Sequence, residues 1–394
     1  MVVWLRRYSF LLLFFCVSGC IEPFEPKVTD KSTDYLVVDG AINSQGMTVI
    51  RLSRTTGLAQ NAKVPIEGKA RVFIEEEAGK QYPLLEGPVG TYTSAALTLP
   101  AGKAVRLHFT TVGGREYASD FTPVKTTPAI DSVTWRARQE GVQIYVNAHD
   151  DTQQSRYYRW TYDETWEFTS GFLSVIKYDR GNMVYRTASE DIYHCWSSAV
   201  STAIKLGTTT KLGQDVVSQQ PITLLPPNST KLRYKYSILV KQYAQTLEEY
   251  QYWEALRKNT ENIGTLFDPL PTQTVGNVHN LANKSEVVIG FVGAQSVTEK
   301  RIFIDEARLP HDWTYITGYE NCIVPDTMER PFTGGGAAVP LTQQQKIDFF
   351  KAGVDIPIDE YVRPGTSTVN YLYSTAECVD CRRRGTNVRP SFWR

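Results

Sequence analysis

Short stretches of alternating apolar and polar residues, separated by glycine, proline and asparagine, run through most of this chain. Between residues 35 and 125 they include YLVVDGAI, MTVIRLSRT, ARVFIEEE, GTYTSAAL, AVRLHFTT and REYASDF. A period of two places every second side chain on one face of a strand, and a series of such strands with turns between them is typical of a β-sandwich. We therefore predict an immunoglobulin-like β-sandwich domain over 35–125.

The strand pattern continues after the linker TPVKTTPAIDS. Val133 and Trp135 alternate with polar residues before a turn, and Val142 and Ile144 do so after it, which predicts a hairpin. Further strands are predicted in YYRWTYDETWEF, VIKYDRGNMVYRT, KLRYKYSILVKQYA and EVVIGFVGAQSVTEKRIFI. The fold class is therefore mainly β, with a larger β-rich domain over 130–394.

Two short helices interrupt the strands of this larger domain. A capping box of Thr246 with Glu249 predicts a helix near 247–261, and the same device after Thr342 predicts a second helix near 343–352. The first helix carries an apolar stripe that we expect to pack in the core: Leu247, Tyr250, Trp253 and Leu256.

The chain begins with the parts of an export signal, MVVWLRRYSFLLLFFCVSGC. Arg6 and Arg7 form a positive region, an apolar run follows, and the small residues Ser18 and Gly19 precede Cys20. This order resembles the lipobox of bacterial lipoproteins. We predict a signal peptide over residues 1–19 and lipidation of the Cys20 thiol.

Lipidation would anchor the protein without a membrane-spanning helix. Several acyl chains, palmitate among them, hold a protein on a membrane where one chain binds only marginally. No later stretch approaches the ~18 consecutive apolar residues of a spanning helix. Residues 20–34, with Pro23 and Pro26, are predicted to form a tether between the lipid and the fold.

The charge balance and the known catalytic motifs limit the function classes. The sequence holds 42 basic and 42 acidic residues, and this neutral balance argues against a nucleic-acid partner. It contains no GxSxG, HExxH or Walker motif, so we expect no catalytic, cofactor-binding or metal-binding residues. The segment His149-Asp150-Asp151 could seat a cation, but a solvated turn is the preferred interpretation.

Four cysteines remain after Cys20: Cys195, Cys322, Cys378 and Cys381. Zinc would need a second close pair of ligands, and a redox CxxC would need a thioredoxin-like setting. Export and an even number of cysteines favour disulfides, and three pairings are open. We prefer bonds that tie the C-terminal tail to Cys322 or Cys195. Residues 382–384, three arginines, are either a solvated turn or a docking patch.

Aromatic residues suggest a further candidate site. Trp160, Trp166 and Trp196, with tyrosines nearby, could stack on the faces of sugar rings. Strands are rich in aromatic residues in any case, so core packing is the competing explanation.

Several segments in order carry a family resemblance: YYRWTYDETWEF, HCWS, YSILVKQYAQTLEEYQYWEALRKNTENIGTLFDPLPTQTVGNV, VVIGFVGAQSV, KRIFI and CVDCRRRGTNVRPSFW. Together they are similar to the domain-of-unknown-function 4249 family of outer-membrane lipoproteins from Bacteroidota, over essentially the whole mature chain. The resemblance implies an outer-membrane lipoprotein, often encoded beside a TonB-dependent receptor. It implies no catalytic residues, because none are established for the family.

Two functional hypotheses follow. The first is a non-enzymatic lipoprotein at the outer membrane, expected on the cell surface with the periplasmic face left open. It would capture a small-molecule, glycan or peptide ligand for a TonB-dependent β-barrel receptor, or assemble with that receptor, in nutrient uptake. The alternative is a surface hydrolase or glycan-binding protein that acts without a receptor.

Overall fold

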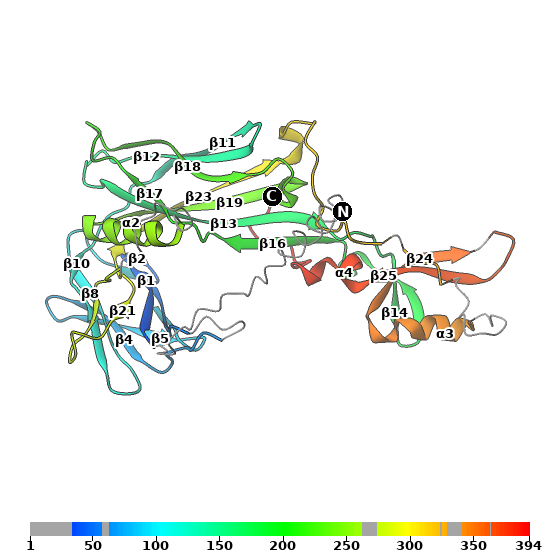
Figure 1. Ribbon diagram of the computed structural model, residues 1–394, viewed down its shortest axis with the longest axis horizontal. Helices are drawn as coiled ribbons and strands as arrows, with labels where there is room; N and C mark the ends of the chain where they lie inside the picture. The colour runs from blue at the N-terminus through cyan, green and yellow to red at the C-terminus, as the bar shows by residue number, and fades with distance from the viewer. Residues whose placement is uncertain (1–33, 57–62, 262–273, 324, 329–340, 363) are drawn as a thin grey trace, which may run out of the picture.

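The computed structural model describes residues 34–56, 63–261, 274–323, 325–328, 341–362 and 364–394. The predicted lipidation site Cys20 and the glycine-rich segment 332–340 lie outside these residues. The described part is mainly β, with a few short helices, as the sequence predicts. None of its helices has the length and apolarity needed to cross a membrane. Figure 1 shows three parts: a curled N-terminal sheet, a layered sandwich, and a smaller lobe that projects from one end of the sandwich.

The N-terminal sheet, here called the first unit, is one continuous ladder in the order β20-β9-β8-β4-β5-β6-β3-β1-β21. Its strands from the predicted first domain are β1 (Leu36–Asn43), β3 (Val49–Arg54), β4 (Arg71–Glu76), β5 (Gln81–Glu86), β6 (Thr91–Ser94), β8 (Ala104–Thr110) and β9 (Glu116–Ser119), with the short pieces β2 (Gln45–Gly46), β7 (Leu97–Thr98) and β10 (Thr122–Pro123). The sheet folds around one core that includes Tyr92, Phe109 and Tyr117. An immunoglobulin arrangement of two sheets stays a prediction.

Three strands from a distant part of the chain complete the first unit. They are β20 (Val278–Asn280), which pairs with β9, and β21 (Val288–Ile289) and β22 (Ala294–Gln295), which pair with β1 in parallel. The predicted boundary at residue 125 is therefore corrected, because the unit also contains residues 278–295. These strands are only two or three residues long, too short to show an alternating pattern.

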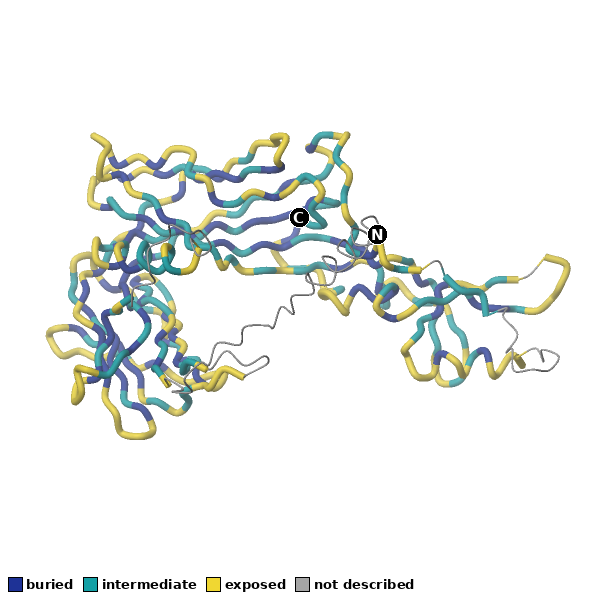
Figure 2. The backbone as a smooth tube through the Cα atoms, viewed as in Figure 1, coloured by how far each residue is buried: buried dark blue, intermediate teal, exposed yellow. Residues whose placement is uncertain are grey.

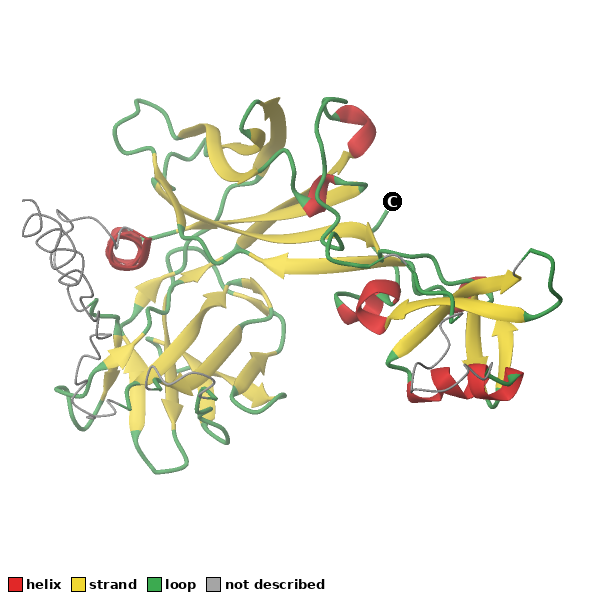
Figure 3. Ribbon diagram, turned by 45° about the vertical axis from the view of Figure 1, so that its right-hand side comes forward, coloured by secondary structure: helices red, strands yellow, loops and turns green. Residues whose placement is uncertain are grey.

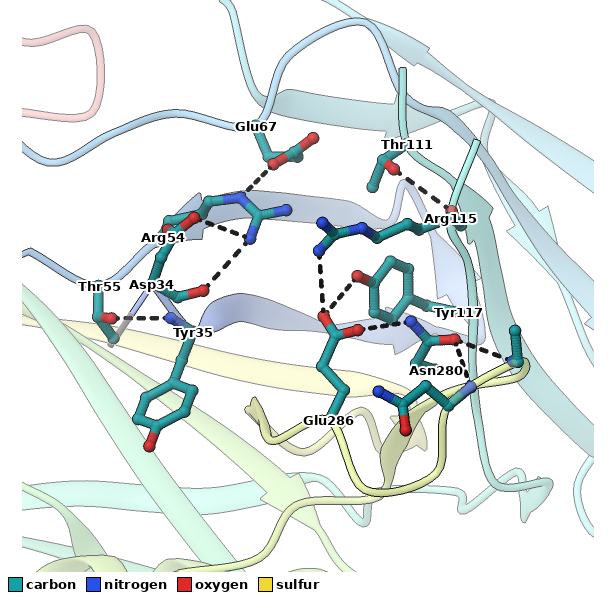
Figure 4. A network of polar contacts seen from close by, with 12 residues as sticks. Asp34, Tyr35, Arg54, Thr55, Glu67, Thr111, Arg115, Tyr117, Asn280 and Glu286 are labelled. Atoms are coloured by element: carbon teal, nitrogen blue, oxygen red, sulfur yellow. Dashed lines mark hydrogen bonds and ion pairs between the residues drawn. The ribbon is translucent and has the colours of Figure 1, made fainter. Parts of the chain in front are cut away.

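A polar network fastens this returning segment to the first unit (Figure 4). The Glu286 carboxylate accepts hydrogen bonds from Tyr117 Oη at 2.7 Å and from Asn280 Nδ2 at 2.6 Å. Burial, together with this bond to Glu286, raises the pKa of Tyr117. In the same network Arg54 Nη1 lies 3.4 Å from Asp34 Oδ2, at the first described residue. The predicted tether would join the fold at this point.

The sandwich consists of two sheets that face each other across a second core. One sheet contains β11 (Ile130–Arg138), β12 (Gly141–His149) and β18 (Val216–Leu225); the other contains β16 (His194–Val200), β13 (Tyr157–Thr169), β19 (Lys235–Ala244) and β23 (Val297–Asp305), with β17 (Lys205–Thr208) beside β13. Short 3₁₀ turns lie at Thr230–Leu232 and Glu306–Arg308. Both sheets bury residues in the shared core, among them Ile144, Trp160 and Tyr236. The predicted hairpin is confirmed, since Val133 pairs with Val146 and Trp135 with Ile144.

Helix α2 (Leu247–Glu261) follows β19 and lies between the sandwich and the first unit (Figure 1). Its bounds match the prediction, but its buried face does not. The buried residues are Glu249 and Tyr252, whereas Leu247 is 43% exposed. The apolar stripe predicted for the core therefore lies to one side of the face that packs.

The projecting lobe, here called the distal lobe, combines an insertion after β13 with the chain near its C-terminus (Figure 1), and Figure 3 shows that it contains both strands and helices. Its elements are β14 (Ile176–Asp179), β15 (Asn182–Tyr185), α3 (Gln343–Asp348), β24 (Asp355–Val362), β25 (Val369–Thr375) and α4 (Ala376–Val379), with 3₁₀ turns at Ala188–Glu190, Phe349–Ala352 and Cys381–Arg383. The capping box of α3 is confirmed, because Thr342 Oγ1 accepts from Gln345 N and Gln345 Oε1 accepts from Thr342 N. Figure 2 shows that the lobe has buried residues of its own. Phe350 and Tyr371 are among them.

Two disulfides link this lobe to the sandwich and brace the C-terminal tail. Cys195 bonds to Cys381, and Cys322 bonds to Cys378. The prediction of structural disulfides is confirmed, and the two cysteines of the CxxC pair each bond to a distant partner. Beyond Cys381 the tail returns along β16, where Trp196 N donates to Thr386 O at 2.8 Å.

Removal of each disulfide should destabilise the protein according to the loop that it closes. The sequence separations are 186 residues for Cys195–Cys381 and 56 for Cys322–Cys378. The chain-entropy model gives upper values of about 5 and about 4 kcal/mol. Urea unfolding of the two paired alanine variants tests this, with the wild type under non-reducing conditions as control. A larger loss for the pair Cys322→Ala and Cys378→Ala, or no loss for either pair, would contradict the account.

Candidate functional site

The structure separates the three tryptophans predicted to stack on sugars. Trp160 is fully buried in the sandwich core, and its Nε1 donates to Gln242 Oε1 at 2.8 Å. This burial leaves no ring face for a ligand, so Trp160 is removed from the predicted site. Trp166 is half-buried, with Lys231 Nζ 4.9 Å from its ring centroid, and Trp196 packs edge-on against Trp393.

The segment around His149 forms a turn. Asp150 is largely buried and accepts hydrogen bonds from the backbone N–H groups of Thr152, Gln154 and Ser155. Burial acts to raise the pKa of Asp150, but the bonds from Thr152 and Ser155 outweigh it and lower the pKa. Within the described ranges no three His, Cys, Asp or Glu side chains gather as metal ligands.

The arginines of the tail are engaged within the chain. Arg382 makes two hydrogen bonds to Asp380, of 2.8 and 2.7 Å. The guanidinium carbon of Arg384 lies 4.0 Å from the ring centroid of Tyr319. These contacts brace the disulfide region, which favours a structural role for this segment over a docking patch.

A cavity of about 510 Å³ lies where the first unit, the sandwich and α2 meet. Small-molecule sites commonly fall within about 300–1,000 Å³ and lie at the junctions of domains. Residues that line it include Asp39, Arg51, Arg159, Lys241, Trp253 and Gln295. A second cavity, of about 590 Å³, is lined by the residues at the start of α2. Phe291 lines both cavities.

Glu249 is the buried acid at this junction. Its side chain belongs to a residue only 2% exposed, and burial raises the pKa of its carboxyl group although Arg159 opposes the shift. The carboxyl packs against the backbone of Gly293, where a Cβ atom would lie 2.3 Å from Glu249 Oε2. Gly293 therefore provides the space for this acid.

Arg159 is held between two aromatic rings on the other side of the carboxyl. Its guanidinium carbon lies 4.6 Å from the ring centroid of Tyr243 and 4.4 Å from that of Trp253. Tyr243 stands opposite Arg159 in the β13–β19 ladder, which explains the stacking. Such contacts stabilise a cation and orient the edge of its guanidinium group. Arg159 Nε has no hydrogen-bond partner, while a hydrogen bond from Trp253 acts to lower the pKa of the Glu249 carboxyl.

Two buried glutamines lie beside Glu249. Gln245 and Gln295 are each 1% exposed, and neither amide oxygen has a hydrogen-bond partner. Hydrogen bonds from both side chains act to lower the pKa of the Glu249 carboxyl, against the larger effect of burial. An unpaired buried polar group costs about 1–3 kcal/mol, so such groups are rare without a structural or functional reason. Gln242, fully buried on β19, accepts from Trp160 and donates to Pro128 O. Gln245 and Gln295 instead meet Glu249 at the junction, next to the cavity that Gln295 lines.

Sequence reasoning missed this site. In the sequence, Glu249 occupied the third position of the predicted capping box, which gave no sign of a buried acid. Half of the box forms, because Thr246 Oγ1 accepts from Glu249 N at 3.2 Å, while the carboxyl is buried. Gly293 was visible in the sequence, but nothing local connected it with Glu249.

Comparisons with known proteins give a family and little else. A family model described as Domain of unknown function (DUF4249) matches residues 21–301. No curated protein matches the chain. A chain from the structure described as "Complete structure of manganese lipoxygenase of Gaeumannomyces graminis and partial structure of zonadhesin of Komagataella pastoris" is 9% identical, with 55% of this chain and 91% of that chain covered and a TM-score of 0.13. A TM-score this low carries no argument about function.

The two kinds of buried glutamine should respond differently to the same substitution. Gln242→Leu should lower the free energy of unfolding by about 1–3 kcal/mol, because it leaves Trp160 Nε1 unpaired and removes one of the two hydrogen bonds to Pro128 O. Gln295→Leu removes an amide oxygen that has no partner together with one hydrogen bond to the Glu249 carboxyl, so the loss of stability should be smaller. Urea unfolding of both variants provides the measurement. An equal or larger loss in Gln295→Leu would contradict this account.

The buried carboxyl of Glu249 should make stability depend on pH. Its raised pKa means that the folded chain keeps a proton which the unfolded chain loses near the ordinary value of 4.5. Stability therefore falls as pH rises from that value through the raised one. Glu249→Gln, which does not titrate, should show a flatter profile in urea unfolding between pH ~4.5 and ~8. The exposed neighbour variant Glu248→Gln is the matched control, and identical slopes for wild type and Glu249→Gln would refute the assignment.

Proposed function

Because this chain belongs to the DUF4249 family of uncharacterised domains, we propose its function from its own geometry. It is a lipid-anchored, non-enzymatic protein of the outer membrane that captures a small ligand in the cavity beside Glu249. It acts as an accessory partner of a TonB-dependent receptor in nutrient uptake. The observation that carries the proposal is the cavity of about 510 Å³ where the first unit, the sandwich and α2 meet, with Arg159 stacked between Tyr243 and Trp253 in its lining.

The arrangement of the residues supports binding. The side chains at the cavity offer hydrogen-bond donors, acceptors and aromatic walls on three separate parts of the fold: β13, α2 and β22. Sites of this kind fix the orientation of a ligand with a few polar groups and obtain affinity from the enclosed surface.

The proposed anchor and partner rest on the sequence. The signal segment and Cys20 support lipidation, and the tether would join the fold beside Asp34, in the first unit. The first unit also supplies one wall of the cavity, through β1 and β22. A cavity so placed would stay near the membrane that holds the receptor. The family resemblance supports the receptor itself.

Co-purification from native outer membranes tests the partner. The tagged, lipidated chain at native expression should retain a TonB-dependent receptor at roughly one receptor per chain after detergent extraction, read by quantitative mass spectrometry. Cys20→Ser, which cannot take the lipid, is the matched control and should leave the membrane fraction. Protease shaving of whole cells reports the exposed face. Recovery of the wild-type chain alone would contradict the receptor partnership and favour a receptor-independent binding or hydrolytic role.

A further inference from the structure

The cavity of about 590 Å³ at the start of α2 has no part in the proposed capture function. Its lining contains two cations, Lys125 and Arg156, and two acids, Asp120 and Glu248. The balance among these four charges, and the apolar surface between them, limits the kind of molecule that the cavity can hold.

Lys125 is a half-buried lysine whose ammonium group has no partner. Its backbone is fixed, because Lys125 N donates to Ala294 O at 2.8 Å and Lys125 O accepts from Ser296 N at 3.1 Å. Within the described ranges its Nζ makes no ion pair or hydrogen bond. It is also not one of the enclosed polar atoms that lack a partner, so it keeps solvent-accessible surface. A ligand can therefore reach this positive charge.

Arg156 is also half-buried, and its hydrogen bonds go to neutral groups. Its Nη2 donates to Gln153 Oε1 at 2.9 Å, and its Nη1 donates to backbone carbonyls, so no carboxylate of the described chain compensates its charge. The two acids are exposed instead: Glu248 at the start of α2, and Asp120, whose Oδ2 lies 3.3 Å from His279 Nε2. Water and salt screen exposed charges more than half-buried ones. The lining therefore favours a negatively charged ligand.

Apolar side chains complete the lining of this cavity. Phe121 is 39% exposed and Leu247 is 43% exposed, and both line the cavity together with Phe291. The guanidinium carbon of Arg106 lies 4.5 Å from the ring centroid of Phe121 and steadies the ring. Leu247 belongs to the stripe that was predicted to pack in the core, and its exposure leaves apolar surface that a ligand can cover. A matching ligand therefore carries an apolar body beside its charge.

We infer that the cavity at the start of α2 binds a small organic acid, a carboxylate attached to an apolar body. Lys125 and Arg156 attract the carboxylate, and Phe121 and Leu247 provide surface for the body. The volume of about 590 Å³ falls within the range of small-molecule sites. An inorganic anion would leave the apolar surface uncovered, and an amine would meet two cations. This site goes beyond the proposed function, which concerns the cavity beside Glu249.

Calorimetry with the full, lipidated chain in a nonionic detergent tests the ligand class. Phenylacetate and hexanoate are the probes, and benzylamine, benzyl alcohol and inorganic phosphate are the cationic, neutral and inorganic comparators. At least one of the two acids should bind more tightly than every comparator. Its affinity should fall as NaCl rises from ~0.05 to ~0.5 M, because salt screens the attraction. Absence of binding by both acids, equal or tighter binding of a comparator, or an affinity independent of salt would overturn the inference.

A substitution of Lys125 locates the binding. Lys125→Met should weaken binding of the active acid by ~10-fold, the equivalent of one lost charge-assisted hydrogen bond, whereas Lys125→Arg, which keeps the charge, should retain most of the affinity. The Lys125 ammonium has no partner in the described chain, so both variants should fold, and circular dichroism checks this. Lys351→Met, which removes an exposed lysine of the distal lobe, is the matched control and should bind as the wild type does. Wild-type affinity in Lys125→Met would overturn the site.

A further variant separates this site from the cavity beside Glu249, because Phe291 lines both. Loss of affinity in Arg159→Met together with wild-type affinity in Lys125→Met would place the acid beside Glu249 and overturn the inference. Recovery of the receptor by a chain that binds neither acid would refute this inference and leave the receptor partnership standing.

Discussion

The backbone ladder of β13 is the interaction on which the rest of the structure depends. This strand pairs with β19 along one edge, and with β17 and then β16 along the other. Because its side chains alternate between two faces, Trp160 fills the core while its neighbour Arg159 reaches the cavity. At the far end Phe168 packs with the Cys195–Cys381 disulfide. A slip of one residue would exchange the two faces and place Arg159 in the core, so the same register fixes both the stability of the sandwich and the geometry of the site.

The buried glutamines of the sandwich and of the junction differ in how far their hydrogen-bonding groups are satisfied. Inside the sandwich, Gln242 is satisfied by two partners and joins β19 to its neighbours. At the junction, Gln245 and Gln295 are just as buried, but their amide oxygens have no partner and their side chains bond only the Glu249 carboxyl. The difference follows from the position of each residue. Gln242 lies on a central strand of one sheet, whereas the junction is assembled from separate parts of the fold with a cavity between them. The first kind of glutamine therefore contributes more to stability than the second.

Signals within short stretches of sequence predicted the elements whose formation depends on neighbouring residues. Alternation predicted the β11–β12 hairpin, and the capping boxes predicted where α2 and α3 begin. Features that depend on contacts between distant residues were missed. β20, β21 and β22 are too short to show a period, and they become strands only because β9 and β1 offer open edges. The cysteine pairing needed the path of the tail. The burial of Glu249 needed Gly293, which reaches α2 through the returning segment, so no window of sequence around either residue contained the site.

The route of the chain places the cavity and the two disulfides at opposite ends of β13. The described chain starts in the first unit, leaves it through the linker into the sandwich, and returns to it after α2 before β23 begins. The cavity is formed at this double crossing, so its shape depends on how the first unit sits against α2. The disulfides act at the other end, where Cys195 and Cys322 hold the tail and the distal lobe against the sandwich. Loop closure by these bonds restricts the unfolded chain chiefly from β16 to the C-terminus. The returning segment is instead held within the first unit by short strand pairs and by the Glu286 network.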